Sequence, residues 1–96
     1  MSILTAIERS AFLADQPGWE IDGELLRRTF ALTDFVAAMA FVTQVAILAE
    51  KAFHHPDIDI RWNKVTLTLS THDEGGLTSR DTELAAEIGK LGAGSS

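Results

Sequence analysis

The sequence predicts an α+β domain of the order α-ββ-α-ββ-α, in which a four-stranded antiparallel sheet has its helices packed on one face. Three segments with apolar residues at helical spacing alternate with two pairs of short strand-like runs. The clearest of these runs, Val65–Thr71, alternates apolar and polar residues. Such alternation is typical of a sheet with one buried and one hydrated face. Helices packed on the buried face complete a fold of this class.

The chain forms one domain, because a second core would need about 50 residues more than these 96 provide. We expect the domain to span residues 1–92 and residues 93–96 to form a flexible tail. Apolar residues make up 46% of the chain and charged residues 23%, which argues against disorder.

The first helix begins at Thr5, because Thr5 and Glu8 have the spacing of a capping box. It ends before Pro17-Gly18, which cannot continue a helix. Its apolar positions at helical spacing are Ile7, Ala11 and Ala14.

The first hairpin turns at Asp22-Gly23, a dipeptide that favours tight turns between half-apolar runs. In the strand that follows, the residues predicted to face the core are Leu26, Phe30 and Leu32. By the same alternation, the side chain of Arg28 should point to the face of Leu26 and Phe30. We therefore expect an edge position, from which its aliphatic stem covers apolar surface while the guanidinium stays in water.

A long helix follows, capped by Thr33 or Asp34 and ending near Phe53. Pro56 enforces this end, because the residue before a proline avoids the helical region. The predicted core-facing stripe has spacings of three and four residues and consists of Phe35, Met39, Val42, Ala46 and Ala49.

The second hairpin pairs a strand over Ile58–Trp62 with Val65–Thr71, through a turn at Asn63-Lys64. Gly75-Gly76 then interrupts the chain, and Thr78–Asp81 opens the last helix. The apolar face of this helix comprises Leu84, Ala85, Ile88 and Leu91.

Composition excludes several classes of function. The chain has no cysteine, which excludes disulfide scaffolds, zinc fingers and thiol catalysis. Eight Lys and Arg against fourteen Asp and Glu give a net charge of −6, and the cations are scattered, so we expect no nucleic acid partner. The apolar window 35–49 is shorter than the roughly 20 residues that a bilayer needs. Because the first residues also lack signal-peptide features, we expect a cytoplasmic protein, a buried long helix and no membrane partner.

All three histidines lie at the ends of predicted elements: His54 and His55 follow the long helix, and His72 ends the alternating strand. Such positions present reactive groups to solvent, and an imidazole exchanges protons readily near neutral pH. Several carboxylates are close to them in the sequence: Glu50, Asp57, Asp59, Asp73 and Asp81. A carboxylate that accepts from one ring nitrogen fixes the tautomer of the imidazole. The cluster therefore predicts proton-transfer chemistry.

Other interpretations stay open at this point. A histidine in such a chain is often only a surface or capping residue. Imidazoles and carboxylates also bind zinc or iron. However, adjacent histidines point in different directions and no His-x-x-x-His spacing exists, so we expect no metal site. Asp81 has a complete structural explanation as a capping carboxylate, and Trp62 is either a core or edge aromatic or a wall for a flat ligand.

Taken together, these residues resemble the signature of the pterin-4a-carbinolamine dehydratases. The signature residues are Glu50, His54, His55, Pro56, Trp62, Ser70, Thr71, His72 and Asp81. The resemblance extends over about Leu4 to Leu91 and includes Pro17-Gly18-Trp19. Phe53 departs from the pattern, because relatives often have a polar residue there.

The resemblance implies an enzyme, a hydro-lyase that removes water from 4a-hydroxytetrahydropterin to give quinonoid dihydropterin. This reaction recycles the tetrahydrobiopterin used by aromatic amino acid hydroxylases and needs neither metal nor organic cofactor. The resemblance implies that His54 and His72 donate and accept protons beside C4a, in an order that the sequence does not fix. Further implied roles are catalysis and pterin orientation for His55, histidine orientation for Glu50 and Asp81, and pterin binding for His55, Pro56, Trp62, Ser70 and Thr71.

Two other functions remain open. Some members of the family act as dimerisation cofactors of a homeodomain transcription factor, so the chain could be a non-catalytic binding module. The substrate could also be another pterin, such as a molybdopterin precursor. For assembly, the polar face of Val65–Thr71 and two unpaired sheet edges predict at least a homodimer, and the long helix offers a route to a tetramer.

Overall fold

The helices and strands occur in the predicted order. A computed structural model describes residues 2–92, so the predicted tail at 93–96 lies outside the described residues. The elements are α1 (Ala6–Asp15), β1 (Glu20–Asp22), β2 (Leu25–Ala31), α2 (Phe35–Ala52), β3 (Asp57–Arg61), β4 (Lys64–Leu69), the short 3₁₀ helix η1 (His72–Glu74) and α3 (Ser79–Gly92). The order α-ββ-α-ββ-α is therefore confirmed, with η1 as an addition.

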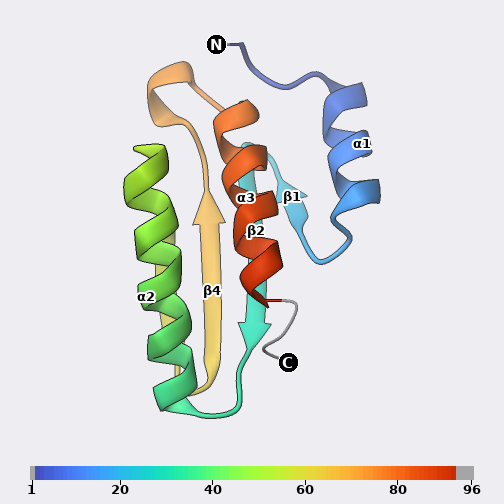
Figure 1. Ribbon diagram of the computed structural model, residues 1–96. Helices are drawn as coiled ribbons and strands as arrows, with labels where there is room; N and C mark the ends of the chain where they lie inside the picture. Colours follow the sequence, from blue (N-terminus) through green and yellow to red (C-terminus); the bar gives the residue numbers. More distant parts are fainter. Residues whose placement is uncertain (1, 93–96) are drawn as a thin grey trace.

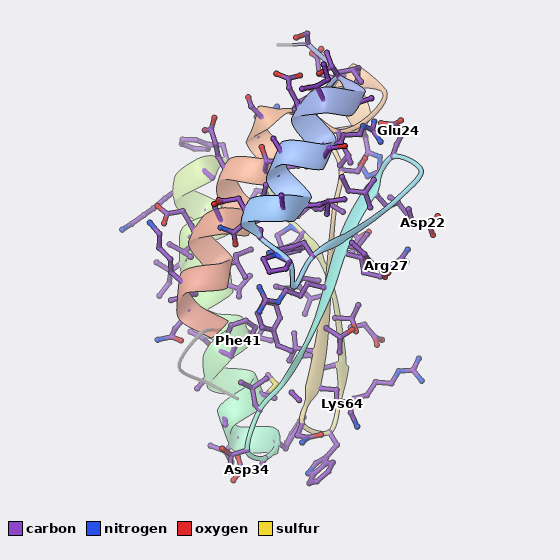
Figure 2. The ribbon with its side chains drawn as sticks, turned by 90° about the vertical axis from the view of Figure 1, so that its right-hand side faces the viewer. Asp22, Glu24, Arg27, Asp34, Phe41 and Lys64 are labelled. Atoms are coloured by element: carbon purple, nitrogen blue, oxygen red, sulfur yellow. The ribbon has the colours of Figure 1, made fainter. Side chains whose placement is uncertain are left out.

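The four strands form one antiparallel sheet in the order β1-β2-β4-β3. Helices α2 and α3 lie side by side on one face of this sheet (Figure 1). Figure 2 shows the arrangement from the side: Phe41 of α2 lies between the helices and the strands, whereas Arg27 and Lys64 project from the other face. The predicted two-layer architecture is confirmed.

Helix α2 packs on the sheet through a different stripe from the predicted one. Its buried residues are Ala38, Phe41, Val45 and Ala49. Of the predicted stripe, Phe35 and Met39 are 51% and 41% exposed, and only Ala49 is fully buried. The stripe prediction was wrong because α2 is apolar on nearly every face, so periodicity cannot identify the face that meets the sheet.

The outward faces of α2 leave much of this helix exposed. Among the described residues, α2 is the one helix that is long and apolar enough to cross a membrane, with 22% of that stretch buried. The core helix of a folded domain meets the same criterion, so this is weak evidence for a membrane span. The prediction of a buried helix holds for the sheet-facing stripe only.

Helix α1 lies at the margin of the domain. The predicted capping box is confirmed, because the Thr5 hydroxyl accepts from the Glu8 N–H at 3.1 Å and Glu8 Oε1 accepts from the Thr5 N–H at 2.8 Å. The predicted apolar face was wrong: Ile7 is 82% exposed, and Phe12 and Leu13 pack against the core instead. The other two residues of the predicted apolar face, Ala11 and Ala14, are also exposed.

Glu24 joins α1 to the rest of the domain. Its Oε1 accepts from the Leu77 N–H at 3.0 Å and from Arg9 Nη2 at 2.7 Å. These contacts, the backbone N–H of Leu77 first and the Arg9 guanidinium second, lower the pKa of the Glu24 carboxyl below its usual range. Leu77 also accepts through its carbonyl from the Leu4 N–H at 2.8 Å, so the start of the chain is tied to the segment that leads into α3.

Arg28 is not on an edge strand. Strand β2 lies between β1 and β4, and Leu26 and Phe30, its neighbours on the same face, are buried as predicted. The Arg28 guanidinium lies 4.4 Å from the centre of the Phe30 ring, a favourable cation–π distance. A Cβ at Gly18 would lie only 2.4 Å from Arg28 Cζ, so the missing side chain of this glycine makes room for the guanidinium.

The second hairpin turns one residue earlier than predicted. Arg61 pairs with Lys64, so Trp62 and Asn63 form the turn, with Trp62 at a positive φ of 51°. Asn63 stabilises this turn through Nδ2, which donates to the Leu32 carbonyl at 2.9 Å. Strand β4 has the predicted alternation, because its buried residues are Val65, Leu67 and Leu69.

Candidate active site

Most of the predicted site residues meet at one end of the sheet. The C-terminus of α2, the start of β3, the end of β4, η1 and the N-terminus of α3 converge there, at the top of Figure 1. The register explains this convergence, since Asp57 at the start of β3 pairs with Thr68 near the end of β4. Pro56 and Ser70 are therefore brought to the same end of the sheet.

The end of α2 turns His54 towards the interior. Phe53 follows the helix in the left-handed conformation, at φ 51° and ψ 40°. The His54 N–H then donates to the Ala49 carbonyl at 3.2 Å. As a result the His54 side chain is only 8% exposed, and its Nε2 lies 2.5 Å from Asp81 Oδ1.

Asp81 is fully buried at the start of α3, and its two oxygens have different partners. Oδ1 faces His54, whereas Oδ2 accepts from the Thr71 hydroxyl at 2.8 Å and from the Thr78 N–H at 2.9 Å. The Thr71 and Thr78 hydroxyls are 2.9 Å apart. Asp81 is thus both the capping carboxylate of α3 and a hydrogen-bond partner of His54. That Asp81 orients His54 for catalysis stays a prediction.

This network fixes the tautomer of His54. An ionised carboxylate can only accept hydrogen bonds, so His54 Nε2 carries the hydrogen that points to Asp81. The lone pair of the neutral ring is then on Nδ1. Nδ1 is therefore the nitrogen of His54 that can accept a proton.

His55 points the other way, as expected for neighbouring residues. Its side chain is 62% exposed, and its Nε2 lies 2.7 Å from Glu50 Oε1. Glu50 is itself 78% exposed, so this pair is open to water and contributes little to stability. The hydrogen bond instead affects the orientation of His55, because the Glu50 carboxylate limits the rotation of the ring.

His72 begins η1 and is exposed. The residue before it, Thr71, is buried, and its backbone forms a bridge with Gly76 through hydrogen bonds of 3.2 and 3.3 Å. The Thr71 hydroxyl belongs to the Asp81 network, so both the backbone and the side chain of Thr71 have protein partners. Ser70, directly after β4, is half-buried at the same end of the sheet.

Trp62 is not brought to this end. It lies in the β3–β4 turn, at the opposite end of β3 from Pro56, and it is 66% exposed. The five residues of β3 separate the two positions, which places them about 20 Å apart along the strand. The structure therefore separates Trp62 from the other predicted site residues of the same chain.

Two residues at this end were not predicted from the sequence. Thr78 links the hydroxyl of Thr71 to the start of α3. Arg80 Nη2 donates to the Phe53 carbonyl at 3.0 Å, across 27 residues of sequence. A sequence pattern could not have found this contact of Arg80, because every residue has a carbonyl oxygen.

The described residues hold no cluster of three or more His, Asp or Glu side chains placed to bind a metal ion. That the chain works without a metal stays a prediction.

Comparison with known proteins decides the family. The family model described as pterin 4 alpha carbinolamine dehydratase matches residues 2–91. The chain belongs to this family. A relative from Roseiflexus castenholzii, named as a pterin-4-alpha-carbinolamine dehydratase, is 54% identical over 90 residues, which cover 94% of this chain and 97% of the relative. The family resemblance inferred from the sequence is confirmed.

Solved structures of related proteins have the same fold. A crystal structure from Brucella melitensis, described as a transcriptional coactivator/pterin dehydratase, superposes with a TM-score of 0.89 at 35% identity and covers 95% of this chain and 99% of that chain. A second structure, described as a pterin dehydratase-like protein and RuBisCO assembly factor in the alpha-carboxysome, has a TM-score of 0.65 at 28% identity, covering 81% of this chain and 89% of that chain. The pterin dehydratase fold therefore includes proteins described by different functions.

Proposed function

We propose that this chain is an active dehydratase, which converts 4a-hydroxytetrahydropterin to quinonoid dihydropterin and water. In this reaction the C4a–O bond breaks and the hydroxyl leaves as water after it gains a proton. The N5 hydrogen is lost as a proton, and a C4a=N5 double bond forms. No electrons are exchanged, so proton transfer by side chains is sufficient and no cofactor is required.

The observation that carries this proposal is the buried His54–Asp81 pair, beside which His55 and His72 are exposed. A histidine held in one tautomer presents a defined acceptor, which is what a general base needs. His54 and His72 act as proton donor and acceptor, whereas His55 binds and orients the pterin with Pro56.

Ser70 is the remaining partner for the polar edge of the pterin, because Thr71 is engaged in the Gly76 bridge and the Asp81 network. Thr71 then acts through the network, which supports His54. Trp62 contributes to a pterin site only if a second chain brings it to the histidines.

The test is the rate of dehydration of a 4a-hydroxytetrahydropterin formed in situ by an aromatic amino acid hydroxylase. The purified chain should accelerate the loss of the carbinolamine absorbance over the spontaneous reaction, and His54→Ala should remove most of this acceleration. Dialysis against a chelator should leave the rate unchanged. A rate equal to the spontaneous one would contradict the proposal, and lost activity restored by zinc would contradict the absence of a metal.

A second function, a protein-binding module, is favoured by one specific observation. The outward faces of α2 expose large apolar side chains: Phe35, Val36, Met39 and Ile47. The descriptions of the two related structures also name a coactivator and an assembly factor. A chain that fails to accelerate the dehydration of any pterin carbinolamine would favour this function over the enzyme.

We further propose that the chain is a cytoplasmic homo-oligomer. The edges of β1 and β3 are unpaired within the described chain, and edges of this kind either repel or join another strand. A two-fold contact between sheet edges gives a dimer, and the apolar face of α2 gives a route to a tetramer. Light scattering that returns the 10.4 kDa monomer mass would contradict this assembly.

A further inference from the structure

We propose that Arg80 is a positioning residue, which holds the two histidine-bearing segments in the arrangement that the reaction needs. The inference rests on the proposed dehydratase function. It assigns Arg80 no contact with the substrate. Arg80 acts instead on the backbone beside His54 and on the turn that carries His72.

The first contact restrains the segment of His54. Arg80 Nη2 donates to the carbonyl of Phe53, the residue directly before His54, at 3.0 Å. Phe53 is a non-glycine residue in the left-handed region, and its side chain is 81% exposed. A backbone conformation of this kind persists only where its surroundings hold it. Because the Phe53 side chain packs against little, the hydrogen bond to its carbonyl is an important restraint.

The second contact reaches the segment of His72. Arg80 Nη1 lies 3.9 Å from Oδ2 of Asp73, the residue directly after His72. Asp73 is 77% exposed, so this ion pair alone contributes little to stability. The ion pair matters for the geometry of the site. The planar guanidinium can contact the Phe53 carbonyl and the Asp73 carboxylate at the same time, which a lysine ammonium does less well.

Arg80 and Asp81 together contact both sides of the site. Asp81 binds His54 itself and Thr71, the residue before His72. Arg80 binds the residue before His54 and the residue after His72. Two consecutive residues in the first turn of α3 therefore fix both segments, although these segments are far apart in the sequence. Small displacements of catalytic groups lower the reaction rate strongly. By preventing such displacements, Arg80 should raise the rate.

The experiment compares Arg80→Gln and Arg80→Lys with Lys90→Gln, a matched loss of one positive charge on the same helix. Lys90 pairs with Glu87 at 3.1 Å and is 77% exposed. Steady-state kinetics gives kcat and KM, and thermal melting gives stability. Imidazole NMR signals of the protein without substrate report the histidine environments. The chain has only three histidines, so single substitutions assign these signals.

We expect Arg80→Gln to lower kcat by about tenfold or more, because displacement of catalytic groups by about 1 Å can cost as much as 10²-fold. KM should change by less than about threefold, since uniform binding is not removed. The signals of His54 and His72 should shift or broaden. Arg80→Lys should recover part of kcat, and Lys90→Gln should match the wild-type chain in every measurement.

Unchanged kcat and unchanged histidine signals in Arg80→Gln would overturn the proposal. So would a loss of kcat that only follows the unfolded fraction, because that would indicate a structural role. If the wild-type chain shows no turnover, the dehydratase function fails on its own. The histidine signals of Arg80→Gln, measured without substrate, still decide whether Arg80 positions these segments.

Discussion

Replacing Asp81 by asparagine should preserve the fold and remove most of the proposed dehydratase activity. The amide has the same shape as the carboxylate, and its oxygen can accept from the Thr71 hydroxyl and the Thr78 N–H as Oδ2 does now, at 2.8 and 2.9 Å. The NH₂ group then takes the place of Oδ1 and faces His54 Nε2 as a donor. His54 must accept through Nε2, so its hydrogen moves to Nδ1, which then has no lone pair with which to accept a proton.

The magnitudes follow from the partners of Asp81. Asp81→Asn loses one acid–base group, so kcat should fall at least about 10²-fold. Its folding free energy should change by only about 1 kcal/mol, since the hydrogen bonds to Oδ2 survive. Asp81→Ala instead leaves the His54 ring N–H and the Thr78 backbone N–H without their acceptor in a buried position, whereas the Thr71 hydroxyl keeps the Thr78 hydroxyl as a partner. At about 1–3 kcal/mol for each unsatisfied group, the total should reach about 3 kcal/mol or more.

The assay combines turnover, melting and imidazole ¹⁵N shifts. A domain of this size loses about 4–8 °C of melting temperature per kcal/mol, so Asp81→Ala should melt at least about 12 °C lower than the wild-type chain, and Asp81→Asn only a few degrees lower. The ¹⁵N shifts of His54 should show the exchanged tautomer in Asp81→Asn. Asp59→Asn is the control, because the Asp59 carboxylate pairs with the exposed Arg61 at the surface, away from the histidines of residues 2–92 to which Asp81 and Glu50 bond. Wild-type turnover in Asp81→Asn, or an unchanged His54 tautomer, would refute the reasoning.

Three further predictions concern the histidines, the core and the acid range. His72→Ala should keep its melting temperature and lose turnover at least about 10²-fold, whereas His55→Ala should raise KM at least as much as it lowers kcat; equal losses of activity and stability would indicate structural histidines. Gly92→Ala should cost about 1–3 kcal/mol in urea unfolding, because a Cβ there would lie 2.3 Å from Cε2 of the buried Phe30; a wild-type midpoint would contradict this. Because folding lowers the pKa of Glu24, its carboxylate stabilises the fold above the unfolded pKa and loses this effect as the pH falls through the folded one. Glu24→Gln should therefore melt below the wild-type chain near neutral pH and approach it as the pH falls below the ordinary glutamate pKa of about 4.3; a constant difference would contradict the linkage.

The boundaries of the elements could be predicted because local chemistry sets them. The Thr5–Glu8 capping box and the Asp34 cap of α2 each satisfy backbone groups within a few residues. The first hairpin turns at Gly23-Glu24, one residue later than the predicted Asp22-Gly23, because Asp22 still pairs with Leu25. The one-residue error at the second hairpin has a physical reason. Trp62 takes a positive φ that bulky residues rarely adopt, and Asn63 stabilises the turn from a contact with Leu32 that is distant in the sequence.

The packing faces of the helices were harder to predict. The apolar residues of α2 surround the helix, so the face that meets the sheet is chosen by contacts with the strands and α3. Arg28 lies in an inner strand because Phe30 and Gly18 accommodate its guanidinium. Neither arrangement leaves a periodic signal in the sequence, since both depend on residues from other elements.

The candidate site was predicted as a set of residues rather than as a geometry. The sequence suggests two separate roles for Asp81, a helix cap and a partner of a histidine, and one carboxylate performs both because its oxygens point in different directions. This sharing has a consequence for the protein. The oxygen that caps the N-terminus of α3 and the oxygen that bonds to His54 belong to one rigid carboxylate. The orientation of the His54 ring therefore depends on the position of α3. A substitution that moves the start of α3 should therefore change proton transfer at His54, even where it contacts neither histidine nor substrate.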